Sequence, residues 1–362
     1  MQLRYPVPLR PGDVVAVTAP SSGVPPALHR RLDAAITSLR ERGFEVLEGV
    51  CLRDGATSEH VSASASARAD ELMALLVDPD VAAVVPPWGG ETGIDLLPYL
   101  DLELLSASEP CWYVGFSDVT TTMLPLTTVA GWATLEGWNL MDTPYRPARG
   151  LLHWLDVATH GSEADGPGQG SPFVQTQASH RRAQGWDDYE SDPAVSEMTL
   201  TEPTRWRVLG GGDARFAGRL IGGCLEVVSP LAGTPYGDVP AWARRVRELT
   251  GEGVIVHLEV AEANPYEAAR TLHGLRLSGW FDDAVGVLVG RTPALGVDGW
   301  SQHDAVADAL GSMGLPVVLD VDFGHQQPMM SLVNGARGEV VVDGEEARLT
   351  QSMTPLGGPG SG

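Results

Sequence analysis

One short segment of the chain has the residue types of an activated serine nucleophile. Gly115-Phe116-Ser117-Asp118-Val119-Thr120 stands at a predicted junction of strand and helix. A tight turn there would lift the serine hydroxyl above a sheet and aim the next backbone N–H at a developing oxyanion. The fifth position is Val119 and not glycine, which departs from the G-x-S-x-G pattern. The segment also fits a helix N-cap, with Ser117 bonding the first turn, and on its own it favours the cap.

A serine nucleophile needs a base, and histidine is the residue type that could supply one here. The chain contains no lysine and all 24 basic residues are arginine, which excludes a Ser–Lys dyad, a Schiff-base lysine and a P-loop lysine. His325 follows the apolar run 317–320 on a loop bounded by glycine and proline, a position that suits a catalytic or a structural residue. His257 lies inside an apolar run and is expected in the core. The other histidines are expected at the surface: His29, His60, His153, His160, His180, His273 and His303.

The third member of such a site would be a carboxylate that orients the imidazole. Glu259 ends the apolar run 254–259, so we expect it at the carboxyl end of a strand, where an exposed glutamate would also fit. Gly89 and Gly90 follow the run 81–85 and could offer a second backbone donor to an oxyanion, or simply form a turn.

The sequence predicts neither a cofactor nor a metal centre. No G-x-G-x-x-G follows the first strand, and no H-E-x-x-H or Cys/His cluster occurs. The three cysteines, Cys51, Cys111 and Cys224, are far apart in the sequence, which disfavours a disulfide framework or a zinc ribbon.

The elements that must position these residues alternate between strand and helix over the first 150 residues. Apolar runs predict strands at 14–19, 44–47, 81–85 and 112–116, with amphipathic helices at 28–39 and 66–77. This order predicts an α/β fold with a doubly wound, flavodoxin-like parallel sheet whose ligands bind at the carboxyl ends of its strands. In the second half, a helix is predicted at 266–277 and strands at 205–209, 217–220, 254–259, 284–289 and 317–320.

These patterns divide the chain into four predicted parts. Residues 1–160 form an N-terminal α/β domain that carries the serine, and the polar stretch 161–200 forms a connecting loop or lid. Residues 201–350 form a second α/β domain with mixed β structure that carries Glu259 and His325. Residues 351–362 form a flexible tail.

Composition narrows the classes of partner. The formal net charge of −23 argues against nucleic-acid and anionic-membrane partners, because phosphates need cations to neutralise them. The 43% of hydrophobic residues indicates a globular chain. The sequence begins without an apolar signal-peptide segment and has no stretch long enough to span a membrane, so a cytoplasmic location is expected.

Several weak fragments occur in a specific joint order over residues 8–340. They are Leu9-Arg10-Pro11-Gly12-Asp13 with Ala19-Pro20-Ser21-Ser22, Gly89-Gly90 before Leu96-Leu97-Pro98-Tyr99-Leu100-Asp101, Gly115-Phe116-Ser117-Asp118-Val119-Thr120, Gly222-Gly223-Cys224-Leu225, Gly233-Thr234, Leu258-Glu259 and Phe323-Gly324-His325-Gln326-Gln327-Pro328. Together they resemble the LD-carboxypeptidase family of serine peptidases, which includes the microcin C self-immunity proteins.

The resemblance implies a Ser–Glu–His triad made of Ser117, Glu259 and His325. It also implies an oxyanion hole built from the backbone N–H of Asp118 and the Gly89-Gly90 turn. With the family included, the nucleophile interpretation of Ser117 replaces the helix cap. The family further implies a homodimer and no cofactor. A member that binds a peptide or nucleotide without turnover is the alternative of another class.

Two branches of the family differ in substrate. Murein LD-carboxypeptidases release D-alanine from a cell-wall tetrapeptide, whereas the self-immunity branch hydrolyses the amide between an amino acid or peptide and a nucleotide-like group. The chain looks more similar to the second branch. Its turn reads Trp88-Gly89-Gly90-Glu91, which makes Trp88 and Glu91 candidate substrate contacts, and its long connection carries Trp186, a candidate for stacking on a purine. Trp206 is the second candidate for stacking, and Cys224 replaces an asparagine that is common in relatives.

Overall fold

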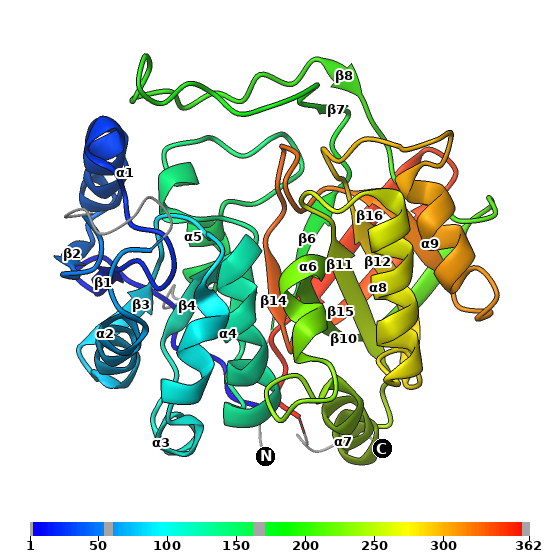
Figure 1. Cartoon of the computed structure of the whole chain (residues 1–362), viewed down its shortest axis with the longest axis horizontal. Coiled ribbons are helices and arrows are strands. Elements are labelled where there is room, and N and C mark those ends of the chain that lie inside the picture. The colour runs from blue at the N-terminus through cyan, green and yellow to red at the C-terminus, as the bar shows by residue number, and fades with distance from the viewer. Residues whose placement is uncertain (1–2, 54–60, 162–170, 357–362) are drawn as a thin grey trace.

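The N-terminal half contains a six-stranded sheet in the order β14-β5-β4-β3-β1-β2 (Figure 1). The computed structural model describes residues 3–53, 61–161 and 171–356. Strands β1 to β5 run parallel in the flavodoxin order 2-1-3-4-5, and β14 joins the edge antiparallel to β5. The strands are β1 (Val14–Val17), β2 (Glu45–Glu48), β3 (Val81–Val84), β4 (Trp112–Gly115), β5 (Thr134–Glu136) and β14 (Leu332–Asn334).

Helices cover this sheet and bury their apolar sides against it. The predicted helix at 28–39 forms as α1, which buries Leu32, Ala35, Ile36 and Leu39. The N-cap of α2 is Ser64, whose side chain accepts from the backbone of Ala67. The helices are α1 (His29–Glu41), α2 (Ala65–Val77), α3 (Leu102–Ala107), α4 (Thr120–Pro125) and α5 (Trp154–Ala158), with short turns η1 (Pro26–Leu28), η2 (Gly93–Tyr99), η3 (Ser117–Val119), η4 (Leu126–Ala130) and η5 (Leu140–Asp142).

The C-terminal half contains an eight-stranded mixed sheet in the order β6-β16-β15-β10-β11-β12-β13-β9. Strands β10 to β13 are parallel, and the remaining pairings are antiparallel. The strands are β6 (Phe173–Thr176), β9 (Arg207–Val208), β10 (Ala214–Cys224), β11 (Val254–Glu259), β12 (Ala284–Gly290), β13 (Val317–Val321), β15 (Arg337–Asp343) and β16 (Glu346–Ser352). The helices are α6 (Leu225–Val228), α7 (Val239–Thr250), α8 (Pro265–Leu277) and α9 (Gln302–Leu310), with the turn η6 (Ser229–Leu231). The predicted fold class, two α/β units with parallel and mixed sheets, is confirmed.

The segment expected as a connecting loop carries more structure than its composition suggests. Strand β6 pairs with β16, and β7 (His180–Arg181) forms a two-stranded ribbon with β8 (Glu202–Pro203). Between β7 and β8 the chain passes over the N-terminal half, at the top of Figure 1. Part of the expected loop, 162–170, lies outside the described residues.

The expected tail also begins too early, because β16 continues to Ser352 and both Met353 and Leu356 are buried. The last six residues, 357–362, lie outside the described part of the chain.

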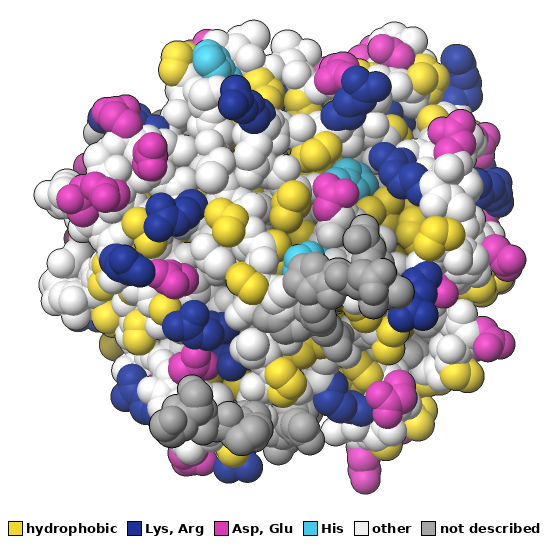
Figure 2. Space-filling view, turned by 180° about the vertical axis from the view of Figure 1, so that it is seen from behind, with side chains coloured by type: hydrophobic (Ala, Val, Ile, Leu, Met, Phe, Trp, Pro, Cys, Tyr) yellow, Lys and Arg dark blue, Asp and Glu magenta, His cyan; other side chains and the backbone are white. Residues whose placement is uncertain are grey.

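The described surface carries charged side chains of both signs. On the face drawn in Figure 2, acidic and arginine side chains are interspersed rather than gathered in one field. Within the described residues, no helix is both long and apolar enough to cross a bilayer.

Candidate active site

Ser117 lies where the chain turns sharply from strand β4 into η3 and α4. Its backbone has φ of 63°, a left-handed conformation that costs a non-glycine residue about 1–3 kcal/mol and persists only when its surroundings enforce it. Its hydroxyl Oγ lies 2.9 Å from Nε2 of His325. The turn therefore presents the hydroxyl to an imidazole instead of to the first turn of its own helix.

His325 bridges the two halves of the molecule. Its Nδ1 lies 2.8 Å from Oε2 of Glu259, which is fully buried at the end of β11. Burial lowers the pKa of His325, but the charge of Glu259 and the hydrogen bond to it raise that pKa more, so the net shift is upward. The structure thus brings Ser117, His325 and Glu259 into one hydrogen-bonded chain.

A second carboxylate fixes the backbone that follows Glu259. Oε1 of Glu226, on α6, accepts hydrogen bonds of 2.9 Å from the backbone N–H groups of Ala261, Glu262 and Ala263. Three donors converge on one oxygen, so the end of β11 is held in place without any contact to Glu259 itself.

A buried arginine holds the loop that carries His325. The guanidinium of Arg291, at the end of β12, donates to the backbone oxygens of Pro328 at 2.7 Å and Gln326 at 3.4 Å. It also forms an ion pair with Asp322, and both side chains are almost completely buried. The loop is therefore pinned just before and just after the imidazole.

The same aspartate ties this loop to the two segments that flank the ribbon, just before β7 and just after β8. Oδ2 of Asp322 accepts from Nε1 of Trp206 at 2.7 Å and from the backbone N–H of Ala178 at 2.9 Å. Trp206 is only 3% exposed, so it is a core residue and not available to stack on a ligand. The structure therefore excludes the second of the two predicted stacking residues.

Gly89 keeps the space in front of the serine clear. A Cβ added there would lie 2.8 Å from the backbone N of Asp118 and 3.0 Å from Oγ of Ser117. Gly90 has φ of 140°, and a side chain on it would overlap the hydroxyls of Ser21 and Ser22. The Gly89-Gly90 turn thus packs directly against the amide that follows Ser117.

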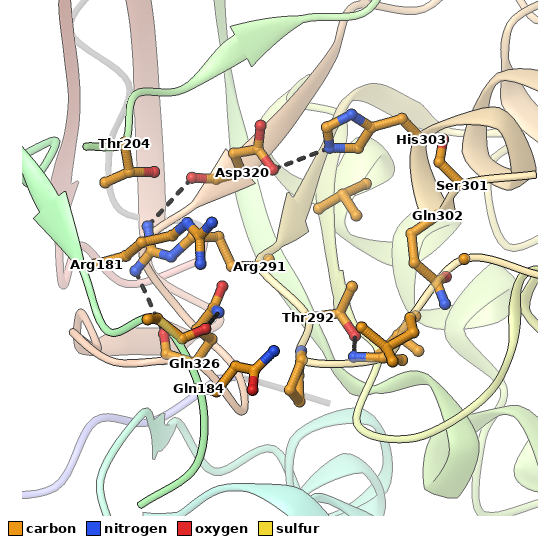
Figure 3. A pocket seen from close by; sticks show the side chains of 18 of the residues that line it. Arg181, Gln184, Thr204, Arg291, Thr292, Ser301, Gln302, His303, Asp320 and Gln326 are labelled. Atoms are coloured by element: carbon orange, nitrogen blue, oxygen red, sulfur yellow. Dashed lines mark hydrogen bonds and ion pairs between the residues drawn. The ribbon is translucent and has the colours of Figure 1, made fainter. Parts of the chain in front are cut away.

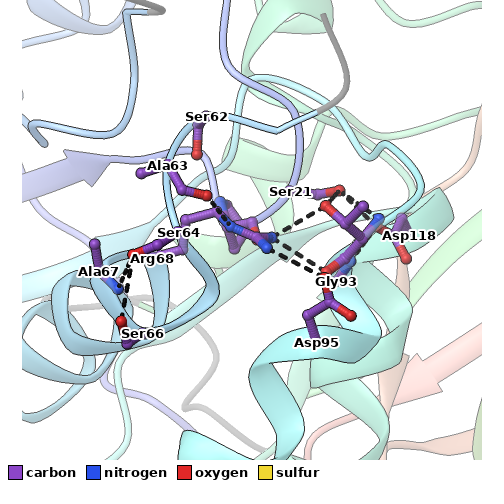
Figure 4. A network of polar contacts seen from close by, with 12 residues as sticks. Ser21, Ser62, Ala63, Ser64, Ser66, Ala67, Arg68, Gly93, Asp95 and Asp118 are labelled. Carbon is purple, nitrogen blue, oxygen red and sulfur yellow. Dashed lines mark hydrogen bonds and ion pairs between the residues drawn. The ribbon is translucent and has the colours of Figure 1, made fainter. Parts of the chain in front are cut away.

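The side chain of Asp118 holds that turn in place (Figure 4). Its Oδ2 accepts from Oγ of Ser21 at 2.6 Å and from the backbone N–H of Gly93 at 2.7 Å. Burial raises the pKa of Asp118, and these hydrogen bonds oppose the shift. Arg68 extends the network by donating to the backbone oxygens of Thr92 at 3.1 Å and Pro20 at 2.7 Å.

An aromatic cavity of about 430 Å³ opens onto Ser117. Trp88, Phe116, Trp186 and Tyr189 all line it, and Trp186 is 42% exposed. Such a volume is in the range of small-molecule sites, and exposed aromatic faces suit a flat ligand. Of the predicted substrate contacts, Trp186 and Trp88 therefore line this cavity.

Glu91 does not join them. It is exposed and is not part of the lining of this cavity. The backbone on either side of it is held by hydrogen bonds, from the N–H of Thr92 to Oγ of Ser21 at 3.1 Å and from the N–H of Ser22 to the oxygen of Gly89 at 3.3 Å.

The segment that carries Trp186 is anchored to both halves. Asp187 forms an ion pair of 2.9 Å with Arg182 and accepts from the hydroxyl of Tyr145 at 2.6 Å. The backbone N–H of Arg182 donates to the oxygen of Gln327 at 2.9 Å, two residues beyond His325. Trp186 is thus positioned by contacts to the nucleophile-bearing half and to the histidine loop.

One group of described residues has the atom types of a metal site. Single ligand atoms of Cys224, Glu259 and His325 all lie within 4.8 Å of one another. Burial and the neighbouring Glu259 raise the pKa of the Cys224 thiol, whose Sγ lies 3.4 Å from an oxygen of Glu226. In the structure both ring nitrogens of His325 are already engaged, Nδ1 by Glu259 and Nε2 by Ser117.

The locations of the histidines outside the triad agree only in part with the predictions. His257 lies in the core, where burial lowers its pKa to about 4 and its Nε2 lies 2.9 Å from Oδ1 of Asn334. His153 was expected at the surface but is buried, because both ring nitrogens bond the backbone, at Leu155 and Thr143. His60 lies outside the described residues.

Asn139 and Tyr189 are among the cavity residues that the sequence interpretation missed. Asn139 follows β5 and accepts from the backbone N–H of Phe116 at 3.2 Å, and Tyr189 lies three residues after Trp186. The position of each residue in the sequence could have identified it as a candidate. One lies just beyond the carboxyl end of a strand in a parallel sheet, and the other is a second aromatic residue in the same polar segment.

Comparison with known proteins places these features in a family context. The family model for the LD-carboxypeptidase N-terminal domain matches residues 15–137, and the model for the LD-carboxypeptidase C-terminal domain matches residues 217–340. The chain is similar to a putative carboxypeptidase of Streptomyces coelicolor, 28% identical with 99% of each chain covered. It is 24% identical to a probable murein peptide carboxypeptidase of Bacillus subtilis, covering 92% of this chain and 90% of that protein. It is 22% identical to the microcin C7 self-immunity protein MccF of Escherichia coli, covering 95% of each.

Solved structures show the same fold. MccF in complex with aspartyl sulfamoyl adenosine has a TM-score of 0.76 at 20% identity and covers 96% of this chain and 98% of that one. A muramoyltetrapeptide carboxypeptidase from Oxalobacter formigenes has a TM-score of 0.65 at 22% identity and covers 94% and 98%. MccF has also been solved with glutamyl sulfamoyl guanosine and, as a tryptophan mutant, with adenosine monophosphate.

Proposed function

The chain belongs to the LD-carboxypeptidase family, and from this premise we propose that it is a serine amidase with Ser117 as nucleophile. His325 is the base and Glu259 orients it. The observation that carries this proposal is the continuous chain of hydrogen bonds of 2.9 Å and 2.8 Å through the imidazole. A nucleophile, a base and an orienting acid in this order are the parts that acyl transfer requires.

Each residue of the triad then has a defined part in the reaction. Nε2 of His325 takes the hydroxyl proton of Ser117 while Oγ attacks the scissile carbonyl carbon and the carbonyl oxygen becomes an oxyanion. Collapse of this intermediate breaks the C–N bond, and His325 gives its proton to the leaving amine. A water then gives a proton to His325 and attacks the acyl ester. Collapse of this second intermediate breaks the bond between the acyl carbon and Oγ, and His325 returns the proton to Oγ, which regenerates Ser117. Glu259 accepts from Nδ1 throughout and stabilises the imidazolium.

The oxyanion is held by backbone N–H groups of Asp118 and of the Gly89-Gly90 turn. The close packing of Gly89 on the amide of Asp118 supports this assignment, because both lie beside Oγ of Ser117. Donors that are fixed before the reaction stabilise charge as it develops without reorganising. The Asp118 carboxylate supplies this rigidity by bonding Ser21 and Gly93.

The proposed substrate is an amide between an amino acid or short peptide and a nucleotide-like group. The aromatic lining of the cavity supports it, since Trp186 and Tyr189 offer π-faces for a base. The ligands solved with MccF, aspartyl sulfamoyl adenosine among them, belong to this class. Exposed Trp186 would stack on the base while the acyl group reaches Ser117.

Side-by-side assays test this choice of substrate. Release of amino acid from an aminoacyl sulfamoyl adenosine is compared with release of D-alanine from a murein tetrapeptide, at equal enzyme concentration. A higher kcat/KM for the nucleotide conjugate is expected. Preference for the tetrapeptide would instead assign the chain to the activity named for its Bacillus subtilis relative.

A labelling experiment separates an amidase from a member that only binds. A fluorophosphonate should modify the wild-type chain at Ser117 and fail to modify Ser117→Ala or His325→Ala. Ser66→Ala, at an exposed serine on α2, serves as the matched control. Hydrolysis by Ser117→Ala at the parent rate would show that the nucleophile is misassigned. Tight binding of the conjugate without labelling or turnover would show a non-catalytic binder.

The homodimer that the family implies and the cytoplasmic location stay predictions. Sedimentation velocity on the purified chain measures the first, and fractionation of the native cells measures the second.

A further inference from the structure

A second cavity, of about 680 Å³, lies in the C-terminal half, and the proposed function does not use it. Val260, Gly290 and Asp320, at the carboxyl ends of β11, β12 and β13, form its floor. Ligands in sheets of this kind bind outside the carboxyl ends of parallel strands. The cavity therefore lies at the carboxyl ends of the parallel strands of the second sheet, just as Ser117 lies at the carboxyl end of β4 in the first sheet.

Two segments separate this cavity from the aromatic one. Ala183 to Gly185 line the second cavity, whereas the next residue, Trp186, lines the first. In the same way Gln326 lines the second cavity and His325 lines the first. The two cavities thus share a thin partition, and none of the described residues lines both.

The charge of this cavity is opposite to that of the chain. The protein has 47 acidic residues against 24 arginines. The lining of the cavity instead contains three arginines, Arg181, Arg207 and Arg291, and one acidic residue, Asp320. Figure 3 shows Arg181, Arg291 and Asp320 in the cavity. Because the lining reverses the sign of the whole molecule, it selects for anions.

Not all of these cations are neutralised within the protein. Arg291 is paired with Asp322, and Arg207 lies 3.2 Å from Asp320. Arg181, on the ribbon strand β7, has no ion pair among the described residues, although Glu202 lies opposite it on β8, and its Nη1 donates a hydrogen bond of 3.3 Å to the backbone oxygen of Arg182. Arg181 therefore remains available to a ligand in the cavity.

Asp320 contacts two other charged or titratable side chains of the cavity, and its own backbone has an unusual conformation. It has φ of 60°, and of the described non-glycine residues only Ser117 and Asp298 share a positive φ. Strain of this kind gathers at functional sites. Its carboxylate is shared between Arg207 and Nε2 of His303 at 2.9 Å. The hydrogen bond to Asp320 raises the pKa of His303, while burial and Arg207 oppose the shift.

We propose that this cavity is a binding site for a small molecule that carries a phosphate or carboxylate group, with Arg181 as the principal cation. The planar guanidinium fork matches the oxygens of either group, and arginine is used for such ligands because it can bind them through two parallel bonds. Gln184 and Gln326 on one side, and Gln302 and Thr292 on the other, supply uncharged polar groups for the rest of the molecule.

The experiment measures binding without turnover. The full chain with Ser117→Ala is titrated calorimetrically with inorganic phosphate and, separately, with succinate, at constant ionic strength set by chloride. Saturable binding of one of them is expected, and the tighter of the two identifies the anionic group. Since no hydrolysis is involved, the result is independent of the proposed amidase activity.

Variants locate the binding. Arg181→Gln should weaken the affinity for the better anion about ten- to a hundredfold, the contribution of a charged hydrogen bond. Arg181→Lys should fall between the two, because it keeps the charge and loses the fork. Arg215→Gln, at an exposed arginine on β10 paired with Glu339, makes the same charge change outside the cavity and should leave the affinity unchanged.

Three outcomes would overturn the proposal. The first is the lack of saturable binding of either anion. The second is unchanged affinity in Arg181→Gln. The third is an equal loss in Arg215→Gln, which would indicate attraction by general charge. Arg181 is partly exposed on a two-stranded ribbon outside the two main sheets, so its replacement should leave the folded state intact, which circular dichroism of each variant checks.

Discussion

Replacing Glu259 by Gln tests the catalytic proposal at its least exposed member. The substitution keeps the size of the side chain and removes a charge that is fully buried and 2.8 Å from Nδ1 of His325. A base must be neutral to act, so kcat/KM rises with pH through the pKa of His325 in the free enzyme. That pKa is raised in the folded protein, which places the acidic limb of the profile above the ordinary histidine value of 6.5.

The magnitude follows from the lost interaction. A hydrogen bond to a charged group contributes about 1.5–3 kcal/mol, and one pKa unit corresponds to about 1.4 kcal/mol. Glu259→Gln should therefore move the acidic limb down by about one to two pH units. The plateau should fall by about 10²–10⁴, because the amide no longer stabilises the imidazolium or holds the productive tautomer.

The assay is kcat/KM for an aminoacyl sulfamoyl adenosine between pH 5 and 9. Glu262→Gln is the matched control, since Glu262 is exposed and raises the pKa of His325 only from a distance. It should move the limb much less than Glu259→Gln and leave the plateau in place. An acidic limb that stays fixed in Glu259→Gln, or that moves upward, would refute the role given to Glu259.

Three further changes probe other parts of the site. Gly89→Ala places a Cβ in front of the Asp118 amide and should lower kcat about 10²- to 10³-fold, the usual effect of losing one oxyanion donor, whereas Gly274→Ala, in open space on α8, should leave kcat unchanged. Trp186→Ala should raise KM for the nucleotide conjugate by about ten- to a hundredfold through lost stacking, with a smaller rise in Trp186→Phe, while KM for a conjugate without a base stays constant. Asp322→Asn leaves Arg291 buried without its counter-charge and should lower the free energy of unfolding by about 3–5 kcal/mol in urea titrations.

Local patterns predicted the strands that are apolar along their whole length. The run 254–259 matches the bounds of β11, and 112–116 differs from β4 by one residue. Strand β10 was underestimated at 217–220, because Gly222 and Gly223 interrupt the apolar run at its carboxyl end. These glycines are required by neighbours: a Cβ on Gly223 would meet Thr120, and one on Gly222 would overlap the backbone of His257. Close packing against neighbouring segments therefore requires glycine at these positions. The sequence of one strand does not reveal which segments will pack against it.

The residues of the site also fall into two groups, those that the sequence could identify and those that it could not. The positions of Ser117, Glu259 and His325 at or just beyond predicted strands made them candidates, and the family resemblance assigned them their roles. The groups that position them could not be predicted, since they depend on contacts between distant segments. Asp322 meets Trp206 and Ala178, more than 100 residues away, and Glu226 meets the backbone after Glu259. Trp206 was misjudged for the same reason, because its indole N–H finds a buried carboxylate that no local pattern announces.

The path of the chain after His325 links folding to activity. Strand β14 begins at Leu332, only seven residues after His325, and it pairs with β5 in the N-terminal sheet. The chain then returns at once to the C-terminal sheet as β15. His325 therefore lies on a segment that crosses between the two sheets and is fixed at both ends, by Asp322 and by β14. Because Ser117 follows a strand of one sheet and Glu259 ends a strand of the other, the hydrogen bonds of the imidazole to both residues require the two sheets to be docked.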